Sequence, residues 1–363
     1  SWIISESFTL PKQIDYLKVR GSFASVGLSF PRWYANPKYV WNEKNRQWSN
    51  QTTYPVYNLK PERTDSWEFG LQTRLFKHFN LDLTYYTTKT YNQTFDPKIS
   101  ASSGYSNMYI QTGNVSNYGI ELAASYNNTW GKFSWSSNYT LSINRNKIND
   151  LVTAYVHPQT KTLITIDKLD ENGIGDAHFI LKKGGTLGDL YSLSDLQRDS
   201  NRKIYVDKNG KVFKNTNVED IKLGSIFPKS NMAWRNDFSW NGLNLGFMVA
   251  ARFGGIVYSA TQANLDYYGV SETTAKARDN GFISINNGQN YINPETWYTT
   301  IGGSDGIPQY YTYSATNIRL QEASLGYTFK KNVFFGIGEL SVSLVGRNLL
   351  KFYCKAPFDP ETT

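Results

Sequence analysis

The chain has 363 residues and a net charge of +8, from 38 lysines and arginines against 30 acidic residues. Mean hydropathy is −0.49, and no stretch approaches the roughly 18 apolar residues that a membrane-spanning helix needs, which excludes a helical membrane protein. The basic residues are spread along the chain, which argues against a nucleic-acid-binding surface, and the single Cys354 excludes an internal disulfide framework.

Alternation of apolar and polar residues predicts nine strands. They cover approximately residues 15–25, 66–75, 79–85, 118–126, 133–143, 232–240, 243–249, 323–329 and 340–344.

The strand at 133–143 shows the pattern most clearly. Its odd positions are apolar except for Ser137, and its even positions are all polar. It also exceeds the usual five or six residues of a strand in a soluble sandwich. An apolar face and a polar face of this length favour a sheet with lipid on one side and water on the other.

Tight turns and long polar connections alternate along the chain. The short turns are predicted at Lys77-His78, at Asn127-Asn128 and at Asn241-Gly242, whereas the long connections cover about 27–65, 95–114, 150–229 and 254–315. Outer-membrane barrels place short turns on the periplasmic side and long loops outside the cell. We therefore predict an all-β fold, an antiparallel transmembrane β-barrel segment of nine or ten strands with long extracellular loops. A further strand is expected just past Thr363.

The longest connection, about 150–229, is expected to carry structure of its own, including a small hairpin around Asp207–Gly210. The polar face would turn a set of charged residues toward the lumen of the barrel. This set is Glu68, Arg74, Asp82, Glu121, Arg235 and Arg252.

Motifs for chemistry are lacking. The three histidines have no metal-ligand spacing, and a calcium-loop reading near 167–173 fails at its first and last ligands. No nucleophile elbow, zinc-binding helix or plausible carboxylate pair is found. We predict that the protein is not an enzyme and uses no metal or cofactor.

Aromatic residues in the 254–315 connection are the candidate ligand contacts. We predict that Trp297, Tyr298, Tyr310 and Tyr311 bind substrate, with the alternative that they pack the loop or contact a partner protein. Aromatic residues on the apolar strand faces, such as Trp135 and Trp234, are interpreted as lipid-facing.

Several strings resemble the SusC/RagA family of TonB-dependent outer-membrane transporters of Bacteroidetes. NLKPERT at 58–64 followed by SWEFGL at 66–71 is similar to the family's "LKPEKT…SWEIGL" signature. LDLTYY at 81–86, GNVSNYGIEL at 113–122, TTAKARDNG at 273–281, LQEASLGY at 320–327, GRNLL at 346–350 and FDPE at 358–361 continue the match in order.

The resemblance implies that residues 1–363 are the C-terminal part of an outer-membrane barrel of about 22 strands with a plugged lumen. The plug, the TonB box and the last strand are expected to be absent here. Implied partners are a SusD-like surface lipoprotein that acts as a lid, TonB, outer-membrane lipid or lipopolysaccharide, and a dimer of transporter–lipoprotein pairs. The implied activity is oligosaccharide import. The alternatives are oligopeptide import, a non-transporting adhesin or surface lectin, and a soluble β-sandwich lectin.

Overall fold

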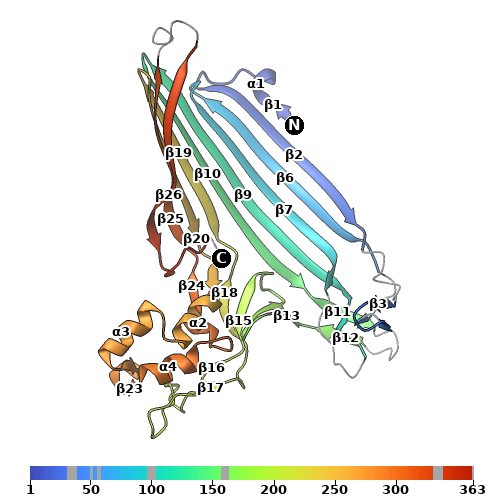
Figure 1. Ribbon diagram of the computed structural model, residues 1–363. Coiled ribbons are helices and arrows are strands. Elements are labelled where there is room, and N and C mark those ends of the chain that lie inside the picture. Colours follow the sequence, from blue (N-terminus) through green and yellow to red (C-terminus); the bar gives the residue numbers. More distant parts are fainter. Residues whose placement is uncertain are drawn as a thin grey trace.

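The computed structural model describes residues 1–30, 39–49, 52–54, 59–95, 104–156, 163–329 and 338–361. A ten-stranded antiparallel sheet dominates the molecule, and a smaller module of short strands and helices lies beyond one end of it (Figure 1). Parts of three predicted loops, at 31–38, 50–51, 55–58, 96–103 and 157–162, lie outside the described residues. Among the described helices, none has the length and apolar character needed to cross a membrane.

The large sheet contains all nine predicted strands, in chain order, which confirms the all-β antiparallel prediction. A two-residue edge strand that the pattern did not predict makes the tenth. From edge to edge the strands are β1 (Trp2–Ile3), β2 (Ile14–Leu28), β6 (Glu62–Leu75), β7 (Phe79–Phe95), β9 (Ile110–Trp130), β10 (Phe133–Asp150), β19 (Ser230–Trp240), β20 (Leu243–Phe253), β25 (Asn317–Phe329) and β26 (Leu340–Cys354). The four-residue helix α1 (Ile4–Ser7) precedes β2.

The turns between paired strands follow local chemistry. At Asn241-Gly242 both residues have positive φ, 48° and 95°, as a two-residue hairpin requires. The turn predicted at Asn127-Asn128 is wrong, because the ladder continues to Trp130 and turns at 131–132, with Gly131 at φ 61°. Trp130 stacks on Phe133 across the strands, with ring centroids 6.0 Å apart, and this contact extends the hairpin.

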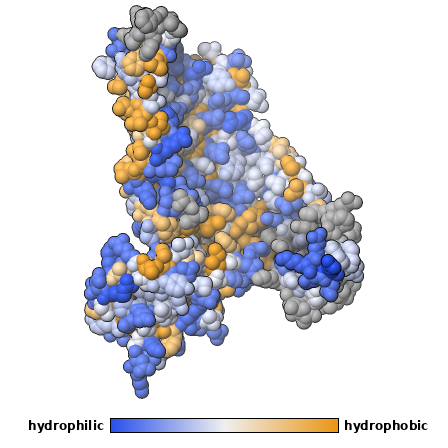
Figure 2. Space-filling model, in the orientation of Figure 1, coloured by the Kyte–Doolittle hydropathy of each residue, from blue (hydrophilic) through white to orange (hydrophobic). Residues whose placement is uncertain are grey.

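The two faces of the sheet differ as predicted. On the apolar face Leu141 lies between Leu122 and Met232, and Trp135 stacks on Phe238 with centroids 6.2 Å apart. Many large side chains of this face are half exposed or more, such as Phe69 at 53% and Leu325 at 54%. An exposed apolar area of this size is unfavourable in water, so the face suits a lipid environment. In Figure 2 the sheet surface turned to the viewer is largely hydrophilic, and hydrophobic residues gather along the β25 and β26 side.

The two longest connections supply the module, except that the hairpin of Val152–Val156 and Leu163–Ile166 lies beside the end of β9, apart from the helices (Figure 1). The first, between β10 and β19, supplies β11 (Val152–Val156), β12 (Leu163–Ile166), β13 (Lys168–Ile174), β14 (Ala177–Lys182), β15 (Asp189–Ser192), β16 (Asp195–Leu196), β17 (Lys214–Asn215) and β18 (Ile221–Ser225). The second, between β20 and β25, supplies β21 (Ile256–Tyr258), α2 (Ala260–Tyr267), α3 (Glu272–Asn280), β22 (Ile283–Ile285), η2 (Asn286–Gly288), β23 (Asn290–Ile292), α4 (Pro294–Ile301), η3 (Pro308–Tyr311) and β24 (Thr312–Ser314). The other two long connections hold the short strands β3 (Val40–Asn42), β4 (Gln47–Ser49), β5 (Thr53–Tyr54) and β8 (Asn107–Met108).

The helices of the module are short and begin at side-chain caps. Ser259 accepts from the backbone N–H of Gln262, and Asn293 accepts from those of Glu295 and Thr296. Helix α3 ends at Gly281, whose φ of 79° suits a left-handed cap. Such local signals allow eight- or nine-residue helices to form without a long apolar stripe, because the surrounding core supplies the stability.

The predicted hairpin around Asp207–Gly210 forms only its turn. The carboxylate of Asp207 accepts from the backbone N–H groups of Asn209 and Lys211, at 2.8 and 2.7 Å. The residues on either side of the turn are not paired as a regular strand ladder, because they pack against other parts of the module.

Candidate functional site

Charged groups on the polar face of the sheet form linked networks. Arg20 on β2 reaches across β6 to β7, where its guanidinium donates to both carboxylate oxygens of Asp82 at 3.0 and 3.1 Å. Gly70 on β6 makes this reach feasible, since a Cβ there would lie only 2.3 Å from Arg20 Nε. Glu68 lies 3.6 Å from the same guanidinium. Arg20 and Asp82 line a hollow of about 520 Å³ on the sheet, together with residues of the neighbouring strands.

A second network crosses β19, β20, β25 and β26. Arg235 donates to Asp237 at 2.9 Å and to Glu322 at 3.0 Å, and Glu322 also pairs with Arg347 at 3.3 Å. Gly246 on β20 leaves room for the side chains that cross this strand, because a Cβ there would lie 2.7 Å from the carboxylate of Asp237. Paired charges of this kind give the polar face a hydrated surface without leaving isolated charges.

Most of the charged residues predicted to face the lumen behave as a set. Glu68, Asp82 and Arg235 belong to the networks described above, and Arg74 and Glu121 line hollows on the same face. Arg252 differs, because it donates to the carbonyl of Ile226 at 2.9 Å and so joins the end of β20 to the module. Its guanidinium thus makes an anchoring contact, and its position on the lumen wall stays a prediction.

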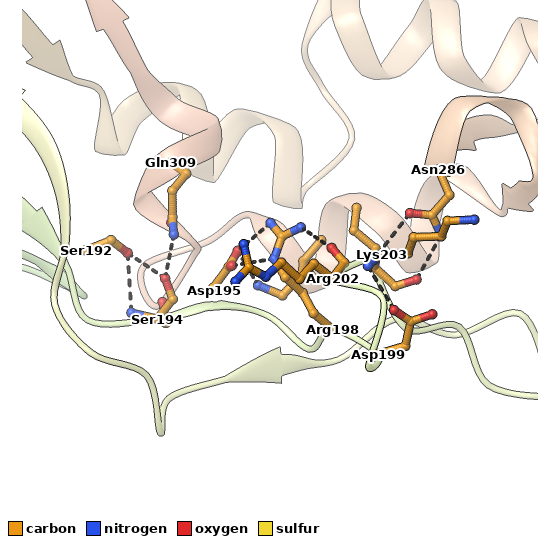
Figure 3. Close-up of polar contacts among 11 residues, drawn as sticks. Ser192, Ser194, Asp195, Arg198, Asp199, Arg202, Lys203, Asn286 and Gln309 are labelled. Atoms are coloured by element: carbon orange, nitrogen blue, oxygen red, sulfur yellow. Dashed lines mark hydrogen bonds and ion pairs between the residues drawn. The ribbon is translucent and has the colours of Figure 1, made fainter.

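The two long connections interlock through polar contacts, which Figure 3 shows. Gln309 donates to the carbonyl of Ser194 at 2.9 Å. Asn286 bonds both the N–H and the carbonyl of Ile204, at 3.0 and 2.9 Å. The segment between these contacts is folded on itself, with Arg198 held by Asp195 at 2.8 Å. Segments about 80 and 115 residues apart in sequence therefore form one folded unit.

The aromatic residues predicted to bind substrate lie in the hydrophobic core of this unit. Trp297, Tyr298 and Tyr311 are 7%, 8% and 1% exposed, and Tyr310 packs edge-on against Trp297 with centroids 5.5 Å apart. Val212 from the first connection packs in the same cluster. The packing alternative accounts for their burial, and contact with a ligand stays a prediction.

Burial also sets the protonation of these phenols. It raises the pKa of Tyr310 to about 12, helped by the nearby carboxylate of Asp195. The pKa of Tyr311 is raised further, first by burial and then by Asp266. Both phenols are therefore neutral under physiological conditions and act as packing groups.

The segment that follows β26 returns to the rim of the sheet. Arg319 on β25 is buried and donates to both carboxylate oxygens of Asp359, at 2.7 and 3.2 Å, with Glu361 at 3.3 Å. Phe358 packs edge-on against Tyr313 of β24, with centroids 5.5 Å apart. This contact ties the module to the barrel, and the sequence reasoning missed it. Its only signal was one arginine within the alternating strand 317–329 and the acidic pair in FDPE.

Metal chemistry finds no support in the described residues. No group of three or more His, Cys, Asp or Glu side chains in that part of the chain could hold a metal ion. The closest charged groupings are ion pairs, such as Asp220 between Lys168 and Lys182 at 2.5 and 3.0 Å. Burial alone would raise the pKa of Asp220, but the hydrogen bonds from the two lysines outweigh it and the pKa is lowered.

No family model matches the sequence, but individual relatives do. TonB-dependent receptor P26 of Formosa agariphila is 26% identical over 325 residues, which cover 84% of this chain and 31% of that protein. TonB-dependent receptor SusC of Bacteroides thetaiotaomicron is 24% identical over 337 residues, covering 83% and 31%. The solved structure of the RagAB peptide transporter matches the whole chain and 40% of its own, with a TM-score of 0.70 and 17% identity.

The SusC/RagA resemblance is confirmed. The similarity to RagAB also confirms the transmembrane β-barrel fold, and the SusC-like chain lies in the bacterial outer membrane. It spans about a third of the length of the curated relatives that it matches. These relatives are named as receptors and transporters.

Proposed function

We propose that this chain forms part of the wall and the outer mouth of a TonB-dependent transporter that imports oligosaccharides across the outer membrane. A SusD-like surface lipoprotein would close over the mouth, and TonB would act through the plug region of the complete protein. Two such transporter–lipoprotein pairs would form the working assembly. The cycle needs gated access and no covalent chemistry.

One observation carries this proposal: the sheet has a bare apolar face and an opposite face crossed by charged networks, and a folded module stands at its long-loop end (Figures 1 and 2). The apolar face suits hydrocarbon, and the charged face suits a water-filled path or a polar plug. A transporter needs a polar inner wall along which a hydrated cargo can pass, whereas a surface adhesin needs only an anchor and a binding module. The networks of Arg20 and Arg235 therefore favour transport over adhesion.

The cargo has two candidates. Exposed tyrosines on the module, such as Tyr268 and Tyr291, support an oligosaccharide, because sugar rings stack on aromatic faces. RagAB is described as a peptide transporter, which favours an oligopeptide as the second candidate. The same polar face serves either class, since both are rich in hydrogen-bonding groups.

Growth and uptake separate the possibilities. A strain lacking the gene is grown on single glycans and on peptides, and the complete gene is restored as a control. Loss of growth on a glycan, with loss of uptake of that labelled glycan, is the expected result. Dissipating the proton gradient should stop uptake but leave surface binding, because TonB draws on that gradient. Loss of growth only on peptides would show that the cargo is an oligopeptide. Uptake that continues after the proton gradient is dissipated would reject the TonB-dependent mechanism.

A further inference from the structure

A groove of about 450 Å³ lies on the surface of the module, away from the buried aromatic core. It is bounded by the end of α2 and by the turn that follows α4. One wall is a tyrosine pair: the rings of Tyr267 and Tyr268 meet edge-on, with centroids 5.2 Å apart. Tyr268 is 74% exposed, so an aromatic face is open to solvent beside a concave surface.

The floor of the groove is held rigidly. Gly303 donates its N–H to the carbonyl of Ala263 at 2.9 Å, which fastens the turn to α2. The φ of Gly303 is 89°, and a Cβ there would lie 3.0 Å from the ring of Tyr267, so glycine lets the turn and the ring approach. Lys214 contacts the carbonyl of Asp305 and pairs with Asp176 at 2.6 Å. The groove therefore needs little reordering to receive a ligand.

Polar side chains line the groove with their bonding capacity unused. The carboxylate of Asp305, the hydroxyl of Ser304 and the amide of Asn264 are exposed, and none makes a side-chain hydrogen bond within the described part of the chain. A carboxylate accepts, while a hydroxyl and an amide both donate and accept. Together they could bond a row of hydroxyl groups.

We propose that this groove binds neutral oligosaccharides, a proposal that rests on the proposed function and names its substrate class at a specific place. An aromatic face beside a carboxylate and an amide matches the apolar face and hydroxyl rim of a pyranose ring. Charge restricts the class further. The ammonium of Lys214 is neutralised by Asp176, so Asp305 is the lining charge without a counter-ion. It disfavours uronates and sulfated sugars by repulsion.

The test is calorimetric titration of the complete protein in detergent. The probes are the neutral hexasaccharides maltohexaose, cellohexaose and laminarihexaose, compared with a hexagalacturonate and hexaalanine. We expect at least one neutral probe to bind. Tyr268→Ala should lower the affinity for that probe roughly five- to tenfold through lost stacking. Tyr268→Phe keeps the ring and should retain the affinity. Asp305→Ala should also lower the affinity for the same probe.

Tyr291 offers a matched control. It is 62% exposed and also meets an aromatic ring edge-on, that of Phe282 at 4.8 Å, but it does not line the groove. Tyr291→Ala should leave binding unchanged. The proposal is overturned if no neutral probe binds, if hexagalacturonate or hexaalanine binds more tightly than the neutral probes, or if Tyr268→Ala and Asp305→Ala leave the affinity intact. If the glycan is still taken up while Tyr268→Ala and Asp305→Ala bind it as the wild type does, the groove proposal alone is rejected. Intact groove binding without energised uptake would reject the transport function alone.

Discussion

Removing Asp359 tests how the module is fastened to the barrel. Arg319 is 4% exposed, and its side-chain partners are Asp359, Glu361 and the amide oxygen of Asn317. Breaking a buried pair from one side leaves an uncompensated charge and costs about 3–5 kcal/mol. The carboxylate of Asp359 is 26% exposed, so water can partly replace it, and we expect Asp359→Ala to lose about 2–3 kcal/mol.

The assay is native-state hydrogen exchange of the complete protein, followed in peptides that cover 312–329 and 350–361. A loss of about 2–3 kcal/mol corresponds to exchange roughly 30- to 150-fold faster in these peptides. Glu361→Ala removes a more exposed partner, and it should change exchange by less than about fivefold. Arg319→Met removes the buried charge itself and should be milder than Asp359→Ala. The predicted role of the ion pair is refuted if exchange in Asp359→Ala is less than threefold faster than in the wild type. It is also refuted if exchange in Arg319→Met is faster than in Asp359→Ala.

The same pair has a pH dependence. Burial alone would raise the pKa of Asp359, but the hydrogen bonds from Arg319 outweigh it and the pKa falls below its usual value near 3.8. A lowered pKa contributes stability that is complete above the unfolded value and is lost as the pH falls through the folded value. Protection of the rim should therefore be constant above about pH 4 and decline below it.

Three further predictions concern the sheet and the module. Gly119→Ala should lower the thermal unfolding midpoint and cost about 1–3 kcal/mol, because its Cβ would lie 2.3 Å from a carbonyl oxygen of β10, whereas Gly27→Ala, with its nearest neighbour at 4.0 Å, should be close to neutral. Trp297→Ala should destabilise the module by about 3–5 kcal/mol and speed its proteolysis while the sheet stays intact; the exposed Tyr291→Ala serves as the control. In an alkaline titration followed by tyrosinate absorbance, Tyr310 should ionise near pH 12 and before Tyr311, and its contribution to stability, complete below pH 10, should be lost as the pH rises through about 12.

The sheet was predictable from sequence because one rule governs it. Side chains alternate between faces, so the apolar row of 133–143 indicates both the strand and its environment. The ends of the strands were harder to predict, since the hydrogen-bonded ladder continues past the apolar band. Beyond that band Asn146 donates to Asn117 at 2.8 Å, and polar cross-strand contacts of this kind extend β9 and β10. Polar residues within a strand carry no period-two signal, so the pattern ends before the strand does.

The module was only partly predictable, because its core joins two distant segments. Trp297 and Val212 pack in one cluster although 85 positions separate them in the sequence, and no local pattern shows that they meet. An aromatic residue in a polar connection looks like a ligand contact until its partner segment is known. The groove has a clearer sequence trace, since Gly302-Gly303 permits close approach and Tyr267-Tyr268 places two rings together.

The shared interior of the two long connections limits how such receptors can be re-engineered. A chimera that takes only residues 163–229 from this chain would bring Leu196 and Val212 without the helices that cover them. Its new surface would expose apolar side chains, and the backbone of Ile204 and the carbonyl of Ser194 would lose their partners Asn286 and Gln309. Exchange of specificity between homologues therefore requires both insertions to be transplanted together, and natural recombination that separates them should be selected against.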